Sequence, residues 1–472
     1  MLRTYAQVKE AMASGKTVAS ILDDYLAAIE KSKELNAFLE VFGTTAKKQA
    51  ILIDQKVQNG TAGKLAGMVV GLKDNLCYEG HKVSASSKIL EGFESLFTGT
   101  AVERLIAEDA IIIGRLNCDE FAMGSSNENS AFGPVLNAIN KNYVPGGSSG
   151  GSATAVAAGL CTAALGSDTG GSIRQPASFT GTVGLKPTYG RISRHGLIAY
   201  ASSFDQIGPF TNNVEDAALL LQIMAGRDDY DSTTSSRPVE DLLEPTAAKK
   251  YRIAVVQESF EMDGLDAEIK AKLEDTIKEL KTDGNEVEFV SFPYLDYMVP
   301  TYYVLTTAEA SSNLSRFDGV HFGHRASDAK GVEATYKKSR TEGFGTEVKR
   351  RIMAGTFVLS HEFYESYYTK GQKVRRVLQN KTDEILKDFD FILTPTTPTT
   401  AFELNAVTDP ISMYLQDIFT VHANLTGNPA ISIPMGNHTN GMPFGIQIVA
   451  NHFKEKEMLI FSRQLEKLQT DS

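Results

Sequence analysis

The sequence predicts an α/β protein, because strand-like and helical segments alternate along the chain. Between residues 67 and 116, two short apolar segments rich in β-branched residues enclose a helical one, the pattern of strand, helix and strand. The same alternation returns between residues 252 and 292. A hydrophobic share of 42% over 472 residues is enough for a sizeable core. This alternation favours parallel strands covered by helices.

Residues 1–59 are predicted to form a mainly helical N-terminal region. Thr17 has a side chain suited to a helix N-cap and precedes a helical pattern at 18–31. A short strand is expected at 36–42, and a further helix at 44–58. We find no catalytic signature in this region.

Residues 60–210 are dense in glycine and in short apolar strands. Strands are expected at 67–73 and 110–116, with a helix at 101–109 between them. The chain's glycine-serine clusters fall in the same region, so we expect the chemistry of the protein to lie here.

A polar, turn-rich stretch at 226–250 is predicted to be a surface connection between two parts of one fold. The second part, residues 251–472, opens with strand, helix and strand at 252–257, 266–284 and 286–292. Further strands are expected at 389–395, 430–435 and 444–450, and a closing helix at 455–469. We therefore treat residues 1–472 as a single domain.

Charge and cysteine content narrow the class of protein. The net charge of −11 is spread along the chain, which disfavours a broad phosphate-binding face. The three cysteines have no CxxC spacing and form an odd set, so neither a disulfide framework nor a zinc site is indicated. The N-terminus lacks the pattern of a signal peptide, and the longest run of low polarity is too short for the roughly 20 residues of a membrane span. These features indicate a cytoplasmic protein.

The segment VPGGSSGGSATAVAAG, residues 144–159, allows three interpretations. A flexible linker is disfavoured, because the glycines lead directly into small apolar residues suited to burial. A phosphate loop is also disfavoured, because no lysine follows the glycines. Elsewhere Gly15-Lys16-Thr17 resembles the end of such a loop, but Glu10 stands where its first glycine should be. The third interpretation is the floor of an active site.

Residues 146–150 match the GxSxG nucleophile elbow, with Ser148 at its centre. The context disagrees with an α/β-hydrolase, because the preceding segment is polar and ends in Pro145 instead of forming a buried strand. No histidine is an obvious partner. His195 reads as a structural or surface residue, and the HFGH motif at 321–324 is not a recognised metal pattern.

A second cluster, LGSDTGGSIRQPA, occupies residues 165–177. A small-residue helix and a short strand between the two clusters can bring Ser148 and Ser172 to one site. Thr169, Gly170 and Gly171 would then supply successive backbone N–H groups with little side-chain bulk, as an oxyanion hole requires.

Lys73 is the candidate base for this site. It ends the apolar segment at 67–73, where burial would lower its pKa and make the neutral amine available. Taken singly, a lysine is more often a surface residue and a glycine-serine turn is more often only a turn. The combination favours nucleophilic catalysis by a serine with a lysine base.

Three stretches carry a resemblance to the amidase signature family: GLKDN, PGGSSGGSA and GSDTGGSIRQPASFTGTVGLKPTYGRISRHGL. The resemblance implies one large mixed central β-sheet covered by helices on both faces. It also implies that Lys73 is the base, that Ser148 is a bridging serine on a cis peptide bond, and that Ser172 is the nucleophile. In such a relay the lysine takes a proton from the bridging serine, which takes one from the nucleophile.

Four further stretches are similar to the glutaminase subunits of tRNA-dependent amidotransferases within that family: PTYGRISRHGLIAYASSFDQIGP, NLSRFDGV, EVKRRIMAGTF and MYLQDIFTVHANLTGNPAISIP. This resemblance implies that Arg351 and Asp417 hold the carboxylate and the ammonium group of glutamine, and that Tyr302 or Tyr303 lines the same pocket. A buried zwitterion needs one fixed cation and one fixed anion. The competing interpretation places Arg351 and Asp417 in surface ion pairs.

The same resemblance implies a heterotrimer, in which a B subunit binds ATP, Mg²⁺ and glutamyl-tRNA(Gln) and a small C subunit completes the assembly. It implies no cofactor or metal on this chain. The main hypothesis is thus a glutaminase subunit, whereas the alternatives are a free-standing amidase for another small amide and a catalytically silent scaffold. A β-lactamase-like motif at 327–330 has the SxxK spacing but lacks its companion motifs.

Overall fold

The computed structural model describes residues 1–244 and 249–470, and its strands form one mixed sheet of eleven members. The sheet order is β1-β3-β2-β4-β6-β5-β10-β11-β9-β7-β8. The strands are β1 (Phe38–Val41), β2 (Val69–Lys73), β3 (Ile111–Leu116), β4 (Ala163–Asp168), β5 (Val183–Lys186), β6 (Gln206–Thr211), β7 (Arg252–Val256), β8 (Glu286–Val290), β9 (Phe391–Pro395), β10 (Ala430–Asn437) and β11 (Pro443–Ala450).

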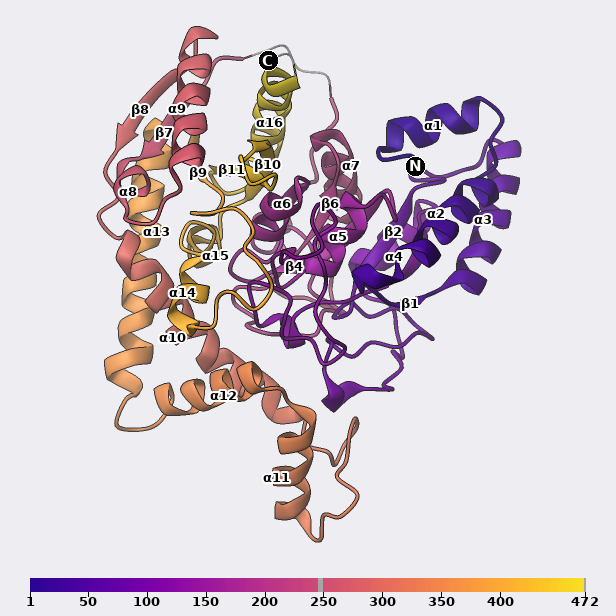
Figure 1. Cartoon of the computed structure of the whole chain (residues 1–472), viewed down its shortest axis with the longest axis vertical. Coiled ribbons are helices and arrows are strands. Elements are labelled where there is room, and N and C mark those ends of the chain that lie inside the picture. The colour runs from indigo at the N-terminus through magenta and orange to yellow at the C-terminus, as the bar shows by residue number, and fades with distance from the viewer. Residues whose placement is uncertain (245–248, 471–472) are drawn as a thin grey trace.

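The helices surround this sheet (Figure 1). They are α1 (Tyr5–Ala13), α2 (Val18–Lys31), α3 (Gly43–Gln58), α4 (Thr100–Ala107), α5 (Gly150–Ala157), α6 (Arg174–Thr180), α7 (Val214–Met224), α8 (Gln257–Glu261), α9 (Ala267–Thr282), α10 (Leu295–Asn313), α11 (Val332–Gly343), α12 (Thr346–Val358), α13 (Lys370–Asp388), α14 (Pro410–Leu415), α15 (Val421–Thr426) and α16 (Glu455–Thr470). Short helical turns are η1 (Lys33–Leu35), η2 (Lys88–Leu90), η3 (Glu120–Ala122), η4 (Leu314–Arg316) and the π-helical η5 (Tyr364–Thr369).

Both predicted alternations of strand and helix are confirmed as parallel units. β2 pairs in parallel with β3, and β7 pairs in parallel with β8. The predicted N-cap is also present, because the Thr17 side chain accepts a hydrogen bond from the Ser20 N–H at the start of α2. Antiparallel pairs such as β4 with β6 and β10 with β11 make the sheet mixed. The α/β fold class is therefore confirmed.

Both faces of the sheet are buried beneath helices. Along β7, Ile253 and Val255 belong to one hydrophobic cluster, while Ala254 and Val256 belong to another. Because side chains alternate between the two faces of a strand, the two clusters lie on opposite faces of the sheet at β7. Helices α7, α9 and α16 contribute to the first cluster, and α10, α12, α13 and α15 contribute to the second.

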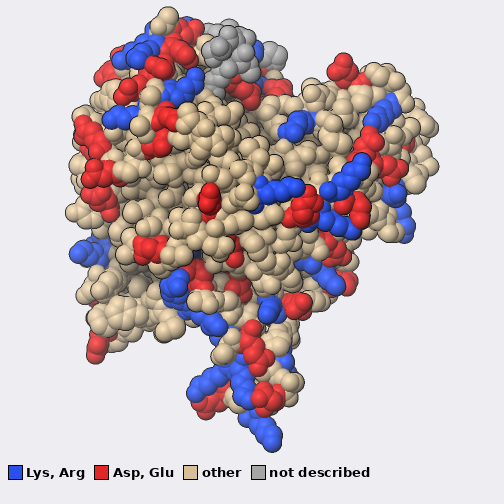
Figure 2. Space-filling model, viewed as in Figure 1, with Lys and Arg blue, Asp and Glu red and all other residues tan. Residues whose placement is uncertain are grey.

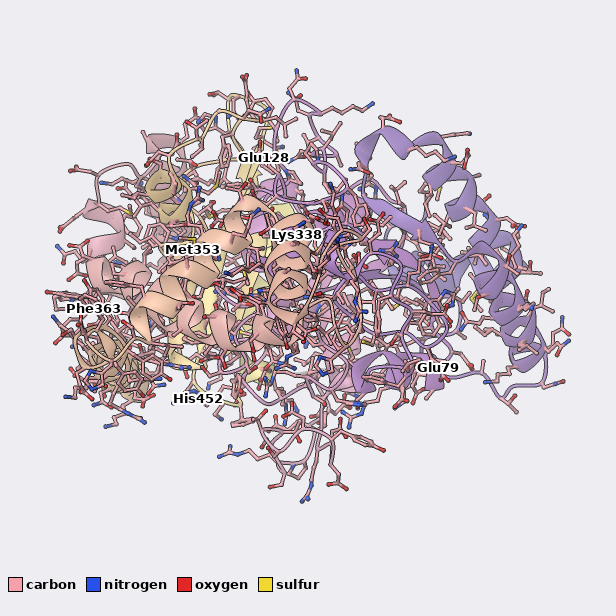
Figure 3. All side chains as sticks on the ribbon, turned by 90° about the horizontal axis from the view of Figure 1, so that it is seen from below. Glu79, Glu128, Lys338, Met353, Phe363 and His452 are labelled. Atoms are coloured by element: carbon pink, nitrogen blue, oxygen red, sulfur yellow. The ribbon has the colours of Figure 1, made fainter. Side chains whose placement is uncertain are left out.

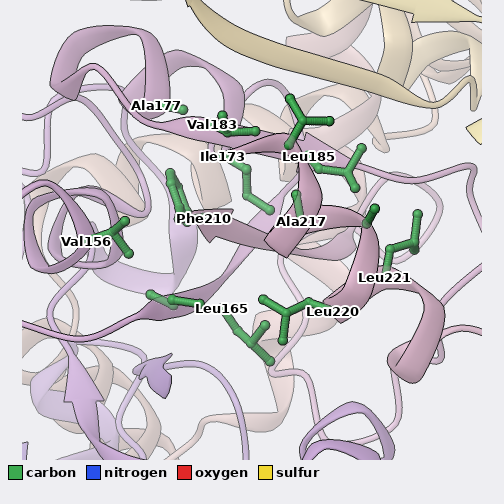
Figure 4. Packing of buried hydrophobic residues seen from close by; sticks show 14 of the residues in the cluster. Val156, Leu165, Ile173, Ala177, Val183, Leu185, Phe210, Ala217, Leu220 and Leu221 are labelled. Atoms are coloured by element: carbon green, nitrogen blue, oxygen red, sulfur yellow. The ribbon is translucent and has the colours of Figure 1, made fainter. Parts of the chain in front are cut away.

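The centre of the sheet forms a close-packed floor for the glycine-serine turns. Figure 4 shows Phe210 of β6 near Ile173 on one side of the sheet and Leu165 of β4 near Leu220 of α7 on the other, and all four side chains are fully buried. Interiors of this density resist displacement of single side chains. The turns that precede α5 and α6 are thereby held on a rigid support.

The connection predicted at 226–250 contains no regular strand or helix in its described residues, and residues 245–248 lie outside them. The chain that follows it does not form a separate sheet, because β10 pairs with β5. The helical stretch from 295 to 388, which contains α10, α11, α12 and α13, was not predicted from the sequence. Figure 1 shows α11 projecting from the body of the molecule.

Candidate active site

Lys73 lies at the end of β2 with a fully buried side chain. Its Nζ is 2.7 Å from Ser148 Oγ, 2.8 Å from Ser149 Oγ and 3.0 Å from Ser167 Oγ. Among the described residues, no carboxylate forms an ion pair with this amine. The side-chain groups that solvate the lysine are therefore hydroxyls.

Burial is the main influence on the pKa of Lys73. The loss of water disfavours the ammonium form and lowers the pKa to about 8, against the opposing fields of buried acidic groups such as Asp119 and Asp168. At that pKa an appreciable share of the side chain is neutral near physiological pH. A neutral amine can accept a proton from a hydroxyl group within hydrogen-bonding distance.

Ser148 lies in a buried turn that leads into α5. The peptide bond between Gly147 and Ser148 is cis, as the family resemblance implies. The Ser148 carbonyl accepts a hydrogen bond of 3.0 Å from the Asp119 N–H, and the Gly147 N–H donates to Gln175 Oε1 at 2.9 Å. A side chain at position 147 would clash with the Asp119 carboxylate. The cluster at 144–159 is thus a fixed turn followed by a buried helix.

Ser172 lies in the turn between β4 and α6. Its side chain is 8% exposed, and no hydrogen bond of its hydroxyl occurs among the described residues, including to Ser148. The two serine turns meet through the Ser149 N–H, which donates to the Ser172 carbonyl at 3.3 Å. The Ser172 hydroxyl is therefore available to a substrate.

A buried ion pair closes this turn. Arg174 donates from Nε to Asp168 Oδ2 at 3.0 Å and from Nη2 to Asp168 Oδ1 at 2.8 Å. The same carboxylate accepts hydrogen bonds from the Gly171 and Ile173 N–H groups at 2.9 and 3.2 Å. Burial alone would raise the pKa of Asp168, but Arg174 outweighs it and holds the pKa at about 2.

The three expected oxyanion donors are not equivalent in the structure. The Gly171 N–H is engaged by the Asp168 carboxylate, so it is not free in this conformation. No hydrogen bond is described for the N–H groups of Thr169 and Gly170. Glycine is required at 170 and 171, because side chains there would clash with Tyr302 and Thr420. Of the three expected donors, the N–H groups of Thr169 and Gly170 are therefore open, and the Ser172 N–H also has no partner among the described residues.

Arg351 is buried on the inner side of α12, which excludes the interpretation as a surface residue. Its Nε donates to Glu347 Oε1 and its Nη1 donates to the Tyr200 hydroxyl, both at 2.9 Å. The rings of Tyr303 and Tyr414 lie 5.1 and 5.6 Å from the guanidinium carbon. Among the described residues, no partner occurs for Nη2, which leaves part of the guanidinium available to an anion.

The side chains of Arg351 and Met353 point to different sides of α12. Met353, two positions from Arg351, is 71% exposed, and Figure 3 labels it on this helix. Only the buried side of α12, which carries Arg351, therefore faces the site. This orientation is set by packing of α12 on α10, where Gly355 lies against the Thr307 carbonyl.

Asp417 is a buried carboxylate without a cation. Its Oδ2 accepts a hydrogen bond of 2.6 Å from the Ser125 hydroxyl, and no ion pair of Asp417 occurs among the described residues. Burial raises the pKa of Asp417 to about 7. An uncompensated buried carboxylate is costly, so an ammonium ligand would be stabilised there.

The two tyrosines expected at the pocket have different neighbours. The ring of Tyr302 packs against Gly170 of the Ser172 turn, where a Cβ atom would lie only 2.5 Å from the ring carbon Cζ. The ring of Tyr303 stacks on Tyr414 at 3.9 Å and lies beside Arg351. Tyr302 and Tyr303 therefore connect the turn and the arginine.

A pocket of about 340 Å³ opens beside Arg351. Its lining comes from segments 124–129, 346–351 and 405–414. Lys73, Ser148 and Ser172 do not line it. The pocket thus reaches Arg351, and the two serines lie outside its lining.

Several site residues were not anticipated from the sequence. Ser149 and Ser167 hold the lysine amine, and Ser125, Tyr200 and Glu347 hold the charged groups of the pocket. Ser149 and Ser167 lie inside the two glycine-serine clusters, so the pattern that predicts the active site also points to these two residues. Glu347 lies four residues before Arg351 on the same helix, so helical spacing was a signal for it. Ser125 and Tyr200 had none, because only the tertiary fold brings them to the site.

Other features of the sequence lie elsewhere. His195 stacks between Phe97 and Tyr230. Within residues 1–244 and 249–470, no three histidine, cysteine or acidic side chains gather where they could hold a metal ion. No helix in that part of the chain has the length and apolar character needed to cross a membrane.

Comparison with known proteins gives matches over most of the chain. The model of the Amidase family matches residues 20–459. The chain is 48% identical over 472 residues to the A subunit of the glutamyl-tRNA(Gln) amidotransferase of Chlorobium limicola, with 99% of each chain covered. It is 51% identical over 453 residues to the protein of that name from Acidobacterium capsulatum, with 95% of each covered.

Solved structures that match this chain include another A subunit of this amidotransferase and an amidase. The A subunit of the glutamyl-tRNA(Gln) amidotransferase of Thermotoga maritima matches with 40% identity and a TM-score of 0.78, covering 96% of this chain and 94% of that one. A peptide amidase from Stenotrophomonas maltophilia matches with 27% identity and a TM-score of 0.82, covering 99% and 97%.

Replacement of Asp168 tests the buried ion pair. We expect Asp168→Asn to lower the free energy of unfolding by about 3 to 5 kcal/mol, because Arg174 would keep a buried charge without its partner. Chemical denaturation at pH 7 measures the change. The matched control is Asp275→Asn, which removes an exposed partner of Lys278 and should leave the free energy of unfolding almost unchanged, because water and salt screen an exposed ion pair. Equal effects of the two substitutions on the free energy of unfolding would contradict the conclusion that Asp168 compensates the buried charge of Arg174.

Proposed function

This chain belongs to the amidase family, and we propose that it is the glutaminase subunit of a tRNA-dependent amidotransferase. It hydrolyses glutamine and supplies the ammonia with which glutamyl-tRNA(Gln) becomes glutaminyl-tRNA(Gln). One observation carries this proposal: among the described residues, the Nη2 atom of Arg351 has no hydrogen bond and Asp417 has no ion pair, although both side chains are buried. Contacts through Tyr302 and Thr420 place them near the Ser172 turn. Such a pair suits the zwitterionic head of an amino acid.

The relay begins at Lys73. Its neutral amine takes the proton of Ser148, 2.7 Å away, while Ser148 takes the proton of Ser172. The Ser172 oxygen then forms a bond to the amide carbon, and the open N–H groups of Thr169 and Gly170 receive the negative charge on the amide oxygen. The hydrogen bond between the two serines forms when substrate binds, since catalytic contacts are often long in free enzymes.

The same relay runs in reverse to expel ammonia. Ser148 returns a proton to the amide nitrogen as its bond to carbon breaks, and Lys73 reprotonates Ser148. A water molecule, activated by the same groups, then hydrolyses the glutamyl ester on Ser172 and releases glutamate. An amide has a poor leaving group, so a shuttle that both removes and delivers protons suits it.

The head of glutamine would be held at the other end of the site. Arg351 presents its open Nη2 to the α-carboxylate, and Asp417 presents its carboxylate to the α-ammonium group. Each contact compensates a buried charge of the protein. Tyr302 and Tyr303 lie between these groups and the turn.

Amidation of tRNA needs functions that we assign to partner subunits. The chain has no phosphate loop with its lysine, and Figure 2 shows lysine and arginine mixed with acidic residues over the visible face. We assign ATP, Mg²⁺ and glutamyl-tRNA(Gln) to a B subunit, and we include a small C subunit in a cytoplasmic heterotrimer. The name of the Chlorobium limicola relative supports this assignment, because it is one of the subunits of an amidotransferase.

A second candidate function is a free-standing amidase. The match to a peptide amidase over nearly the whole chain supports it, and the lysine and both serines lie on this chain. It differs from the first proposal in substrate, because it would act on an amide without a free amino-acid head.

Substitution of the nucleophile tests the chemistry. We expect Ser172→Ala to abolish amide hydrolysis while circular dichroism and chemical denaturation remain those of the wild type, because one oxygen is lost from a turn held by other bonds. Lys73→Ala and Ser148→Ala should each lose most of the rate, and their combination should be little worse than either. A folded and fully active Ser172→Ala chain, or multiplied losses in the double variant, would refute the relay.

The pH dependence of glutamine hydrolysis tests the lysine. Only the neutral amine accepts a proton, and the pKa of Lys73 is about 8. We expect kcat/KM to rise about tenfold per pH unit below that value and to level off above it. The measurement is the initial rate of ammonia release between about pH 6 and about pH 9.5, a range that spans the expected transition. A flat profile over this range would exclude Lys73 as the base.

Reconstitution with partners tests the biological function. We expect the purified chain to release some ammonia from glutamine and to lack tRNA-amidating activity. Candidate B and C subunits from the same genome should bind it stably, raise its glutaminase rate in the presence of glutamyl-tRNA, and permit ATP-dependent amidation. If the partners neither bind nor change the rate, the free-standing amidase is the correct function.

A further inference from the structure

Tyr200 lies between the two halves of the proposed site, with a side chain that is only 1% exposed. Its hydroxyl accepts a hydrogen bond of 2.9 Å from Arg351 Nη1 and donates one of 3.0 Å to Thr306 Oγ1. The Thr306 hydroxyl in turn donates to the Tyr302 carbonyl at 2.8 Å. Because the Tyr302 ring packs on Gly170, this chain of contacts runs from the arginine to the Ser172 turn.

A second route connects the same ends through Asp205. The Tyr200 N–H donates to Asp205 Oδ2 at 2.9 Å, and the Ala201 N–H donates to the same carboxylate at 3.1 Å. The Thr169 hydroxyl donates to Asp205 Oδ1 at 2.7 Å. Asp205 and Thr169 are 2% and 1% exposed. The N–H group of Thr169 has no partner among the described residues and is one of the expected oxyanion donors, so the backbone of Tyr200 is tied to these donors.

These contacts have little freedom to adjust. Tyr200, Thr306, Tyr302 and Asp205 are all buried, and a hydrogen bond in a water-free interior is stronger than one at the surface. Tyr200 uses both hydrogen-bonding functions of its hydroxyl, one toward the arginine and one toward the turn. An anion that fixes the guanidinium therefore also fixes the phenol that it contacts.

We propose that Tyr200 is a positioning residue that couples occupation of Arg351 by the substrate's α-carboxylate to the alignment of the turn at 169–172. This inference rests on the proposed function, in which Arg351 holds that carboxylate. The kcat for glutamine is then higher than the kcat for an amide without the amino-acid head, and glutamine is also bound more tightly. A tyrosine that served only to hold Arg351 would affect KM alone.

The test compares glutamine with butanamide, which lacks the α-carboxylate and the α-ammonium group, in the full-length chain with its partner subunits where these bind. We expect Tyr200→Phe, which keeps the ring and removes the hydroxyl, to lower the ratio of kcat for glutamine to kcat for butanamide by about tenfold. The KM for glutamine should change less. Arg351→Ala should lower the same ratio and also raise the KM for glutamine.

A double-mutant cycle with Thr169→Val tests the connection to the turn. Thr169→Val removes the hydroxyl bound by Asp205 and keeps the backbone N–H. If the two ends are coupled, Tyr200→Phe should lower the ratio by less than about threefold in the Thr169→Val chain. Independent effects, which multiply, would overturn the proposal.

Tyr414→Phe is the matched control. This tyrosine also supports the arginine, because its hydroxyl donates to Glu347 Oε1 at 2.9 Å, but among the described residues it has no hydrogen bond toward the turn. We expect a higher KM for glutamine and an unchanged kcat ratio. An equal fall of the ratio in Tyr414→Phe and Tyr200→Phe would overturn a specific role of Tyr200.

The outcomes also separate this inference from the proposed function. If the wild type hydrolyses butanamide and glutamine with equal kcat/KM, the proposed function and the coupling both fail, whereas equal kcat with a lower KM for glutamine overturns the coupling alone. If the wild type prefers glutamine and Tyr200→Phe changes only KM, the coupling alone fails. Chemical denaturation monitors folding, and Thr306→Val, which removes the next hydroxyl in the chain of contacts, should reproduce the fall in ratio if Tyr200→Phe does not fold.

Discussion

The burial of the Lys73 amine is the constraint on which the site depends. β2 lies between β3 and β4 in the interior of the sheet, and the lysine at its end is fully buried. Three serine hydroxyls solvate the amine at 2.7 to 3.0 Å. A carboxylate in their place would stabilise the ammonium form and raise the pKa again. The two glycine-serine clusters, at 144–159 and 165–177, therefore supply the hydroxyls as well as the reacting oxygen.

Two buried arginines have different roles: Arg174 stabilises the fold, and Arg351 is available to a ligand. Arg174 is saturated, because Asp168 and the surrounding carbonyl and amide oxygens use its donors. It fixes the turn that carries Ser172. Arg351 is only partly used, and Asp417 has no cation among the described residues. A buried charge that lacks full compensation favours a ligand of opposite charge, and the proposed substrate carries both.

Sequence patterns could predict local elements and the core of the site. The strand that ends at Lys73 and the turns around Ser148 and Ser172 carry strong local signals in their apolar and glycine content. Helix α10 gave no such signal, since it contains Pro300 and has no clear apolar stripe. The pairing of β10 with β5, the engagement of the Gly171 N–H by Asp168 and the position of Tyr200 all depend on contacts between distant segments or on turn geometry. Propensity and periodicity hold no information on such contacts.

The most direct test of a relay that starts at Lys73 is the titration of the Lys73 amine itself. NMR of the chain labelled with ¹³C at the lysine side chains follows each ε-carbon with pH, and the Lys73→Arg variant identifies the signal of Lys73. We predict a single titration with a pKa of about 8, below the ordinary range of lysine, and the buried Lys186 is assigned separately with Lys186→Arg. A Lys73 signal that titrates above about pH 10, the usual range of a lysine, would show an ordinary ammonium group and would contradict a lysine base.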